Sequence, residues 1–259
     1  NRKTFITLLS GGVAMASIQP FYDWTKGLGE EEEKMPVLFI GHGSPMNAIE
    51  DNEFSKRWQQ MGKEIRTPKA VVVVSAHWLT KGTLVTAMPN PKTIHDFGGF
   101  PQALFDVQYP APGSPELASE IQKLITNPAV ELDHDWGLDH GTWSVVKHMY
   151  PDADIPVLQL SIDYYKPAAY HYELAKQLLA LRKKGVLIIG SGNMVHNLRM
   201  VAWDKLNEPE YGFDWALEMN EIFKNKISNG FHKELIQYEK LNKSATLSIP
   251  STDHYYPLL

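Results

Sequence analysis

Three runs of apolar residues, rich in β-branched side chains, each end in a short turn that brings in a histidine. Residues 37–40 lead into Gly41-His42-Gly43-Ser44, residues 70–74 into Ser75-Ala76-His77, and residues 186–189 into Gly190-Ser191-Gly192, with His196 shortly after. Short apolar runs bounded by turn residues are typical of strands buried on both faces. Ligands of open α/β sheets bind outside the carboxyl ends of the strands, so we expect the three histidines along one rim.

The segments between these strands predict helices. Apolar spacing and capping residues favour helices at 48–63, 114–126, 166–184 and 211–226, a charged helix reaching about 241, and further strands at 83–88 and 156–162. A loop at 89–113, rich in Gly, Pro and aromatic residues, is expected to cover a pocket. Alternating strands and helices predict an α/β fold. We expect a single domain with a mostly parallel central sheet flanked by helices, and an active site at the carboxyl ends of the strands.

Composition limits the chemistry that the 259 residues can perform. The chain has no cysteine, which excludes disulfides, thiolate metal sites and a cysteine nucleophile, so a metal would need His, Asp or Glu ligands. A net charge of −5 gives no basic surface, and nucleic acid is therefore not expected as a partner.

The first 34 residues differ from the rest. Arg2-Lys3 precede a mostly apolar run at 5–18, and an acidic linker follows at 30–34. This layout predicts a signal peptide before a catalytic domain at 35–259, with a disordered or helical extension as the alternative. We expect an exported or periplasmic protein if the segment is a signal and a cytoplasmic one otherwise, with no membrane contact in the mature form.

Spacing alone leaves the role of the histidines open. Imidazole suits Zn, Fe, Cu and Ni, but a histidine after a strand is also a common structural hydrogen-bond donor. No phosphate loop follows Gly41-His42-Gly43-Ser44, and no Gly-x-Ser-x-Gly elbow is present. Four further histidines are expected at the surface or in packing: His134, His148, His171 and His232.

A series of motifs makes the pattern specific. In order, they are Gly41 to Met46, Ser75 to Trp78, Thr93 to Pro101, Tyr109 to Gly113, Asp139-His140-Gly141, Ser191 to Asn193 with Val195-His196-Asn197, and His254-Tyr255 with Pro257-Leu258-Leu259. Together they resemble the class III extradiol ring-cleavage dioxygenases, in particular the DOPA 4,5-dioxygenase subgroup. The resemblance spans about 35–259.

The resemblance implies a divalent metal held by His42, His77 and His254, with His196 as a fourth ligand or as the acid/base. Zn²⁺ is described for the subgroup, whereas Fe²⁺ is the expected ion in turnover, because zinc cannot change its redox state. His140 is implied as the second catalytic histidine, a hydrogen-bond donor to substrate or oxygen. Two residues, His95 and Ser44, are implied in substrate binding.

The function implied is cleavage of a catechol ring beside its diol by O₂, with a DOPA-like substrate and a yellow semialdehyde product. The implied partners are the aromatic diol and O₂. Assembly into a homo-oligomer is an alternative that the sequence leaves open. Two alternatives remain: a zinc hydrolase using the same histidines, and a non-catalytic metal-binding protein. Relatives continue beyond the position of Leu259, so we expect an uncovered edge of the fold near His254.

Overall fold

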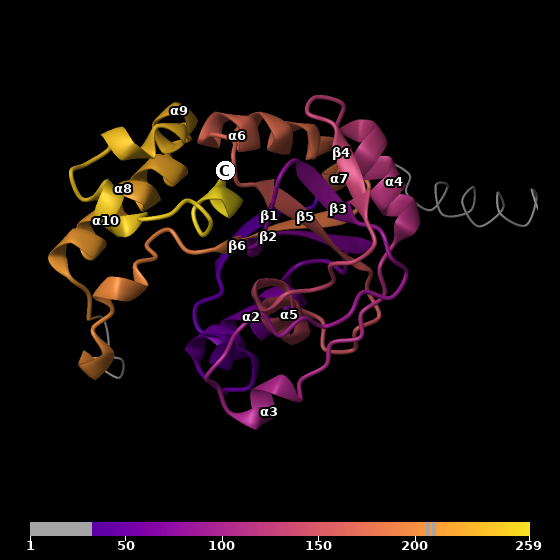
Figure 1. Ribbon diagram of the computed structural model, residues 1–259, viewed down its shortest axis with the longest axis horizontal. Coiled ribbons are helices and arrows are strands. Elements are labelled where there is room, and N and C mark those ends of the chain that lie inside the picture. The colour runs from indigo at the N-terminus through magenta and orange to yellow at the C-terminus, as the bar shows by residue number, and fades with distance from the viewer. Residues whose placement is uncertain (1–32, 206–207, 209–210) are drawn as a thin grey trace, which may run out of the picture.

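A six-stranded sheet forms the centre of the computed structural model, which describes residues 33–205, 208 and 211–259 (Figure 1). The strands, in spatial order, are β1 (Val37–Gly41), β6 (Val186–Gly192), β2 (Ala70–Thr80), β5 (Val157–Asp163), β3 (Thr83–Thr86) and β4 (Val130–Asp133). The first four are mutually parallel, and β3 pairs with β5 in the antiparallel sense. The predicted fold class is confirmed, and the predicted signal segment lies outside the described residues apart from its last two positions.

Alternate residues of the central strands face opposite layers of helices. Val71 and Val73 pack in a core with Trp58 of α2 (Glu53–Glu64) and Trp143 of α5 (His140–Met149). Val72 packs on the other face, in a core with residues of α4 (Pro115–Leu124), α6 (Ala168–Gln177) and α7 (Leu179–Lys183). Burial on both faces explains why the strands are continuously apolar.

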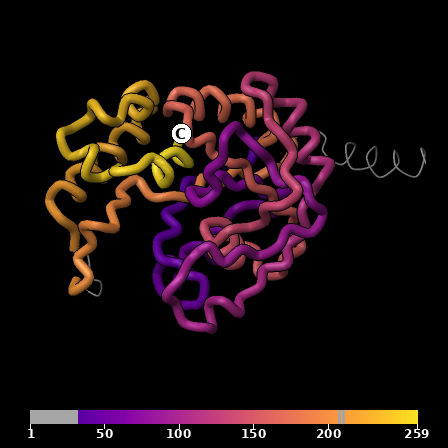
Figure 2. Tube along the Cα trace, in the orientation of Figure 1, coloured from indigo at the N-terminus to yellow at the C-terminus, as the bar shows by residue number. Residues whose placement is uncertain are grey.

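The C-terminal part forms its own helical layer beside the sheet. It contains α8 (Asp214–Ser228), α9 (His232–Ile236), the short α10 (Ala245–Ser248) and the final 3₁₀ turn η5 (Tyr256–Leu258). Met219, Phe223 and Tyr255 lie in a third core that these elements share. Figure 2 shows the yellow end of the chain returning to the middle of the molecule, near the start of α6. Among the described residues, no helix has the length and apolar character needed to cross a membrane.

Several predicted helices differ at their ends. The helix predicted at 48–63 begins at Glu53, because the Asn52 side chain caps it and residues 45–48 form a 3₁₀ turn, η1. The helix predicted at 166–184 is split into α6 and α7 at Leu178, whose N–H bonds the carbonyl of Ala175 in a tightened turn. The loop at 89–113 contains one short helix, α3 (Gln102–Phe105).

Two glycines of β6 allow the C-terminal segment to reach the sheet. A Cβ at Gly190 would overlap the carbonyl of Pro257, and one at Gly192 would overlap the carbonyl of His254. Because both side chains are absent, the backbone N–H of Asn193 donates to the His254 carbonyl at 2.9 Å. This contact brings His254 to the carboxyl end of β6. His254 itself is buried there, with only 6% of the residue exposed.

Candidate active site

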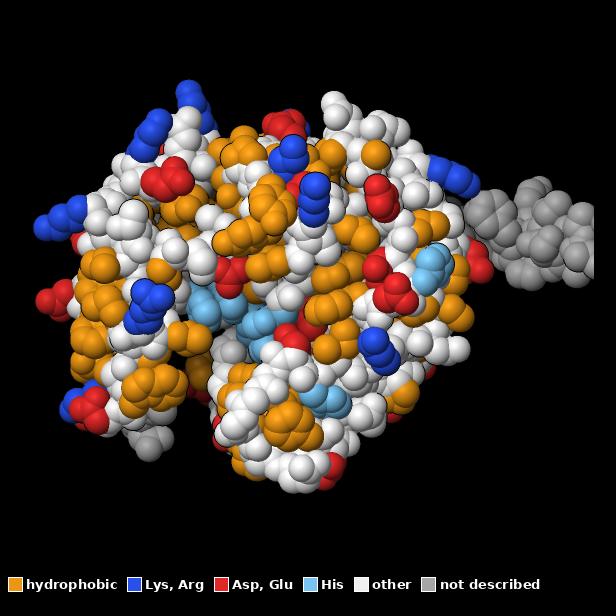
Figure 3. Space-filling view, viewed as in Figure 1, with side chains coloured by type: hydrophobic (Ala, Val, Ile, Leu, Met, Phe, Trp, Pro, Cys, Tyr) orange, Lys and Arg blue, Asp and Glu red, His pale blue; other side chains and the backbone are white. Residues whose placement is uncertain are grey.

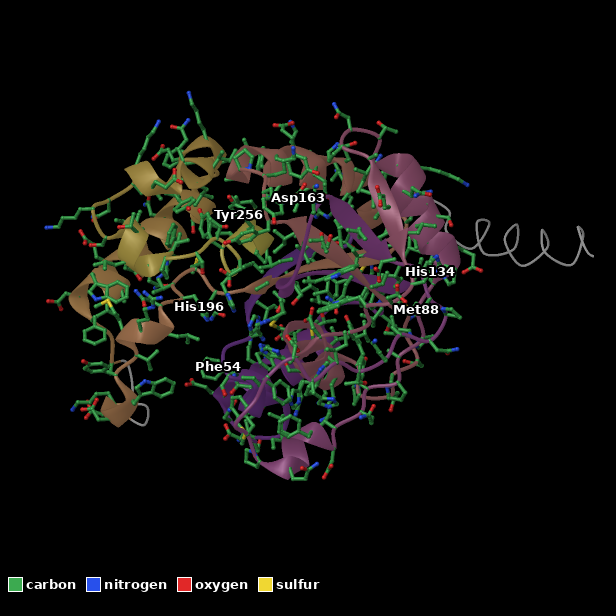
Figure 4. All side chains as sticks on the ribbon, viewed as in Figure 1. Phe54, Met88, His134, Asp163, His196 and Tyr256 are labelled. Atoms are coloured by element: carbon green, nitrogen blue, oxygen red, sulfur yellow. The ribbon has the colours of Figure 1, made fainter. Side chains whose placement is uncertain are left out.

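Five histidines from distant parts of the chain gather at the carboxyl ends of the parallel strands. They are His42 after β1, His77 in β2, His140 at the start of α5, His196 after β6, and His254 before η5. The His42 ring centroid lies 5.0 Å from that of His77, 5.5 Å from that of His140 and 5.2 Å from that of His254. Figure 3 shows pale-blue histidine side chains at the inner end of a hollow, and Figure 4 labels His196 on the side of the C-terminal helices.

His42, His77 and His140 form the tightest group. Their nearest ring nitrogens all lie within 4.8 Å of one another, and the Nε2 atoms of His42 and His77 are 3.1 Å apart. The β2 strand shifts register between Val74 and Leu79, in the stretch that contains His77. Irregularities of this kind are common next to active sites, where they re-aim a side chain. Three imidazoles at this separation have the donor set and the spacing of a divalent metal site.

Ser191 fixes the orientation of the His42 ring. The Ser191 hydroxyl donates its hydrogen to the Gly141 carbonyl at 2.5 Å and lies 2.9 Å from Nδ1 of His42. Since a hydroxyl has a single hydrogen, Ser191 must accept at the second contact, and Nδ1 of His42 must carry a proton. In the neutral imidazole this leaves a lone pair on Nε2, the atom that faces His77.

Asp96 holds the other two rings of the group. Its Oδ1 accepts from the backbone N–H of His140 at 2.9 Å and lies 3.0 Å from Nδ1 of the same residue. Its Oδ2 lies 3.4 Å from Nδ1 of His77. Burial favours the neutral acid, but the hydrogen bonds from His140 outweigh it and lower the pKa of Asp96 below its ordinary value. Asp96 is therefore a carboxylate that directs the Nε2 atoms of both rings away from itself.

His254 and His196 form the second part of the site. Nδ1 of His254 lies 2.5 Å from Oδ2 of Asp253, so His254 also presents Nε2 to its surroundings. The His196 ring stacks on that of His254, with centroids 3.5 Å apart and planes only 10° from parallel. These two histidines and Asp253 are a second group whose ligand atoms lie within 4.8 Å.

Burial keeps several of these imidazoles neutral. Burial, followed by the nearby charges of His77 and His254, lowers the pKa of His42 well below its ordinary value. Burial and His140 lower the pKa of His77 to about 3, and burial and His254 lower the pKa of His196 to about 4. Neutral imidazole is the form that binds metal ions and accepts protons.

The remaining predicted site residues make structural contacts in this structure. His95 lies at 2.9 Å from the Val107 carbonyl through Nε2, and its ring packs near Trp143. The Ser44 hydroxyl accepts from the N–H of Met46 and caps η1. Both roles in substrate binding stay predictions. Sequence reasoning missed Asp96, Asp253 and Ser191, although the first two directly follow or precede a predicted site histidine.

Comparison with known proteins identifies the group to which this chain is related. Residues 36–257 match the family described as the catalytic LigB subunit of aromatic ring-opening dioxygenase. A 4,5-DOPA dioxygenase extradiol of Escherichia coli is 51% identical over 87% of this chain and 83% of its own length. The corresponding protein of Beta vulgaris is 38% identical over 89% of this chain and 87% of its own.

A solved structure agrees with these relatives. An uncharacterized protein of E. coli K12 superposes with a TM-score of 0.74 and 45% identity, covering 87% of this chain and 86% of that chain. The predicted family and enzyme class are thereby confirmed, in preference to a hydrolase or a non-catalytic metal-binding protein. This chain belongs to the LigB family of aromatic ring-opening dioxygenases and is an extradiol ring-cleaving enzyme.

Proposed function

We propose that this enzyme uses a bound Fe²⁺ ion and O₂ to open the ring of a catechol with a DOPA-like side chain. The carbon–carbon bond beside the diol breaks, the hydroxylated carbon becomes a carboxylate, and its neighbour becomes an aldehyde. Both oxygen atoms of one O₂ enter the product, so no external reductant is needed. The observation that carries the proposal is the cluster of imidazoles, in a member of a family of ring-opening dioxygenases, in which His42, His77 and His140 bring ligand nitrogens within 4.8 Å of one another.

The hydrogen bonds of the site fit a metal. His42, His77 and His254 have their Nδ1 atoms next to Ser191, Asp96 and Asp253 respectively. Such partners fix the tautomer of ligating histidines and raise their basicity. The Nε2 atoms of His42 and His77 lie 3.1 Å apart, a separation at which both nitrogens can bind the same cation. We propose these three histidines as the metal ligands, and we assign His140, which lies in the same tight group as His42 and His77, to the substrate or oxygen instead.

The stack of His196 on His254 supports different roles for the two rings. A nitrogen lone pair lies in the plane of its ring, and the two planes are parallel with centroids 3.5 Å apart. The in-plane lone pairs of the two rings are therefore directed along separate, parallel planes and not toward one common point. We therefore propose His254 as the ligand and His196 as the acid/base, in preference to four histidine ligands.

The proposed division of work follows from these positions. Bound Fe²⁺ would favour the deprotonated diol and supply the redox chemistry that zinc lacks. His196, neutral at pH 7, accepts a proton from the diol and later returns one. His140, paired with Asp96, presents Nε2 to the same space and hydrogen bonds to substrate or oxygen. Phe97, whose ring lies 5.5 Å from His140, helps to exclude water.

The test is anaerobic reconstitution with Fe²⁺ or Zn²⁺, followed by DOPA and air. We expect oxygen uptake and a yellow product with Fe²⁺, neither with Zn²⁺, and loss of both in His42→Ala. A matched control is His232→Ala, which removes a histidine on α9, away from the cluster. A folded, Fe²⁺-loaded protein that consumes no oxygen with any simple catechol would contradict the proposal.

A further inference from the structure

A small cavity opens directly beside His196 and has a cation in its wall. Its volume is about 300 Å³, which is enough for a substituent of a small aromatic substrate. It is lined by His196, Asn197, Leu198, Arg199, Pro250 and Ser251. His196, the proposed acid/base, and the exposed Arg199 therefore line one cavity.

The backbone that carries Arg199 is held in place. The Asn197 side chain accepts from the N–H of Arg199 at 3.2 Å and donates to the Leu247 carbonyl at 2.9 Å. The N–H of His196 donates to the Ser248 carbonyl at 2.8 Å. These bonds tie the backbone of residues 196–199 to the chain before His254, so the backbone of Arg199 has a fixed position relative to that of His196.

The guanidinium of Arg199 has no partner to neutralise it in the described part of the chain. Arg57, by comparison, pairs with Glu64 at 3.0 Å. The carboxylate of Asp253 is near the cavity through Ser251, but it is already bonded to His254. A guanidinium presents a planar pair of donors that matches a carboxylate and keeps its charge at any working pH.

We propose that Arg199 binds a carboxylate on the side chain of the catechol substrate. This inference rests on the proposed function, in which His196 acts at the diol of the same molecule. With the ring beside His196, a side chain that extends into the cavity brings its acid group to Arg199. The enzyme then selects acidic catechols, of which DOPA is one, over neutral or purely cationic ones.

The experiment compares two catechols that differ in the carboxylate: dihydrocaffeate has a propanoate side chain, and ethylcatechol has an ethyl side chain without an acid group. The ratio of their kcat/KM values is measured for Fe²⁺-loaded wild type, Arg199→Gln and Arg199→Lys. Lys81→Gln is the control, because Lys81 is an exposed cation of a neighbouring cavity that reaches Asp253 but not His196. Equilibrium binding of both catechols to the Zn²⁺-loaded proteins is measured in parallel without oxygen.

We expect the preference for dihydrocaffeate to fall about 10- to 100-fold in Arg199→Gln, because this is the effect of losing one charge-assisted hydrogen bond. Arg199→Lys should keep part of it, and Lys81→Gln all of it. An unchanged ratio in Arg199→Gln, an equal fall in Lys81→Gln, or a wild type that binds both catechols equally would overturn the assignment. If neither catechol is cleaved but Arg199→Gln loses a binding preference present in wild type, then Arg199 binds the carboxylate and only the proposed function is wrong.

Discussion

Ser191→Ala tests whether the hydrogen bonds behind the proposed metal ligands prepare the site. Ser191 is fully buried, and its hydroxyl joins Nδ1 of His42 at 2.9 Å to the Gly141 carbonyl at 2.5 Å. The variant leaves the buried Nδ1–H of His42 without a partner, at a cost of about 1–3 kcal/mol for the unsatisfied group. It also frees His42 to adopt the tautomer with a proton on Nε2, which cannot bind a metal.

We expect the Kd for Fe²⁺ or Zn²⁺ to rise about 10- to 100-fold, the usual effect of removing such a partner. The measurement is a competition titration against a chelator, with the free energy of unfolding of the metal-free protein followed in urea. Ser144→Ala is the matched control, because its hydroxyl is also buried but has no hydrogen-bond partner among the described residues. Equal metal affinity in both variants would refute the argument from the tautomer.

Three further changes test other parts of the structure. Asp96→Asn removes the charge that pairs with His140, so kcat/KM for DOPA should fall more than tenfold in oxygen-uptake kinetics, and an unchanged value would contradict the pairing. Burial lowers the pKa of His171, so the unfolded state binds more protons than the folded state as pH falls below about 6.5, and the free energy of unfolding drops. His171→Gln should reduce that drop in urea titrations between pH 7 and about 5. An unaltered pH dependence of stability would contradict this explanation. Gly190→Ala should lower the free energy of unfolding by about 1–3 kcal/mol or more, because its Cβ overlaps the Pro257 carbonyl, and a neutral result would argue against the tight packing of this segment.

The central sheet could be predicted because its strands are buried on both faces and are therefore continuously apolar. Val71 to Val74 and Val186 to Ile189 show this plainly, and their positions place His77 and His196 at one rim. The antiparallel direction of β3 could not be predicted, because side chains alternate between the two faces in the same way in parallel and antiparallel strands. The strand β4 was missed because it is short, with only Val130 fully buried.

The candidate site was predicted less completely than the sheet. His254 follows no strand, and its place in the cluster depends on the close approach of the C-terminal segment to Gly192, a contact that spacing cannot show. The link from Asp96 to His140 spans 44 positions and requires the loop at 89–113 to fold over α5. The resemblance to the dioxygenases was needed to predict that His254 binds the same metal as His42.

We propose that this site inserts both atoms of O₂ into a catechol ring, and labelling with ¹⁸O₂ is the direct test. Fe²⁺-loaded protein is given DOPA under ¹⁸O₂ in unlabelled water, and the product is trapped and analysed at once by mass spectrometry. We expect a ring-opened product with one labelled oxygen in the new carboxylate and one in the new aldehyde. A product with an intact ring, or with its new oxygen drawn from water, would contradict it.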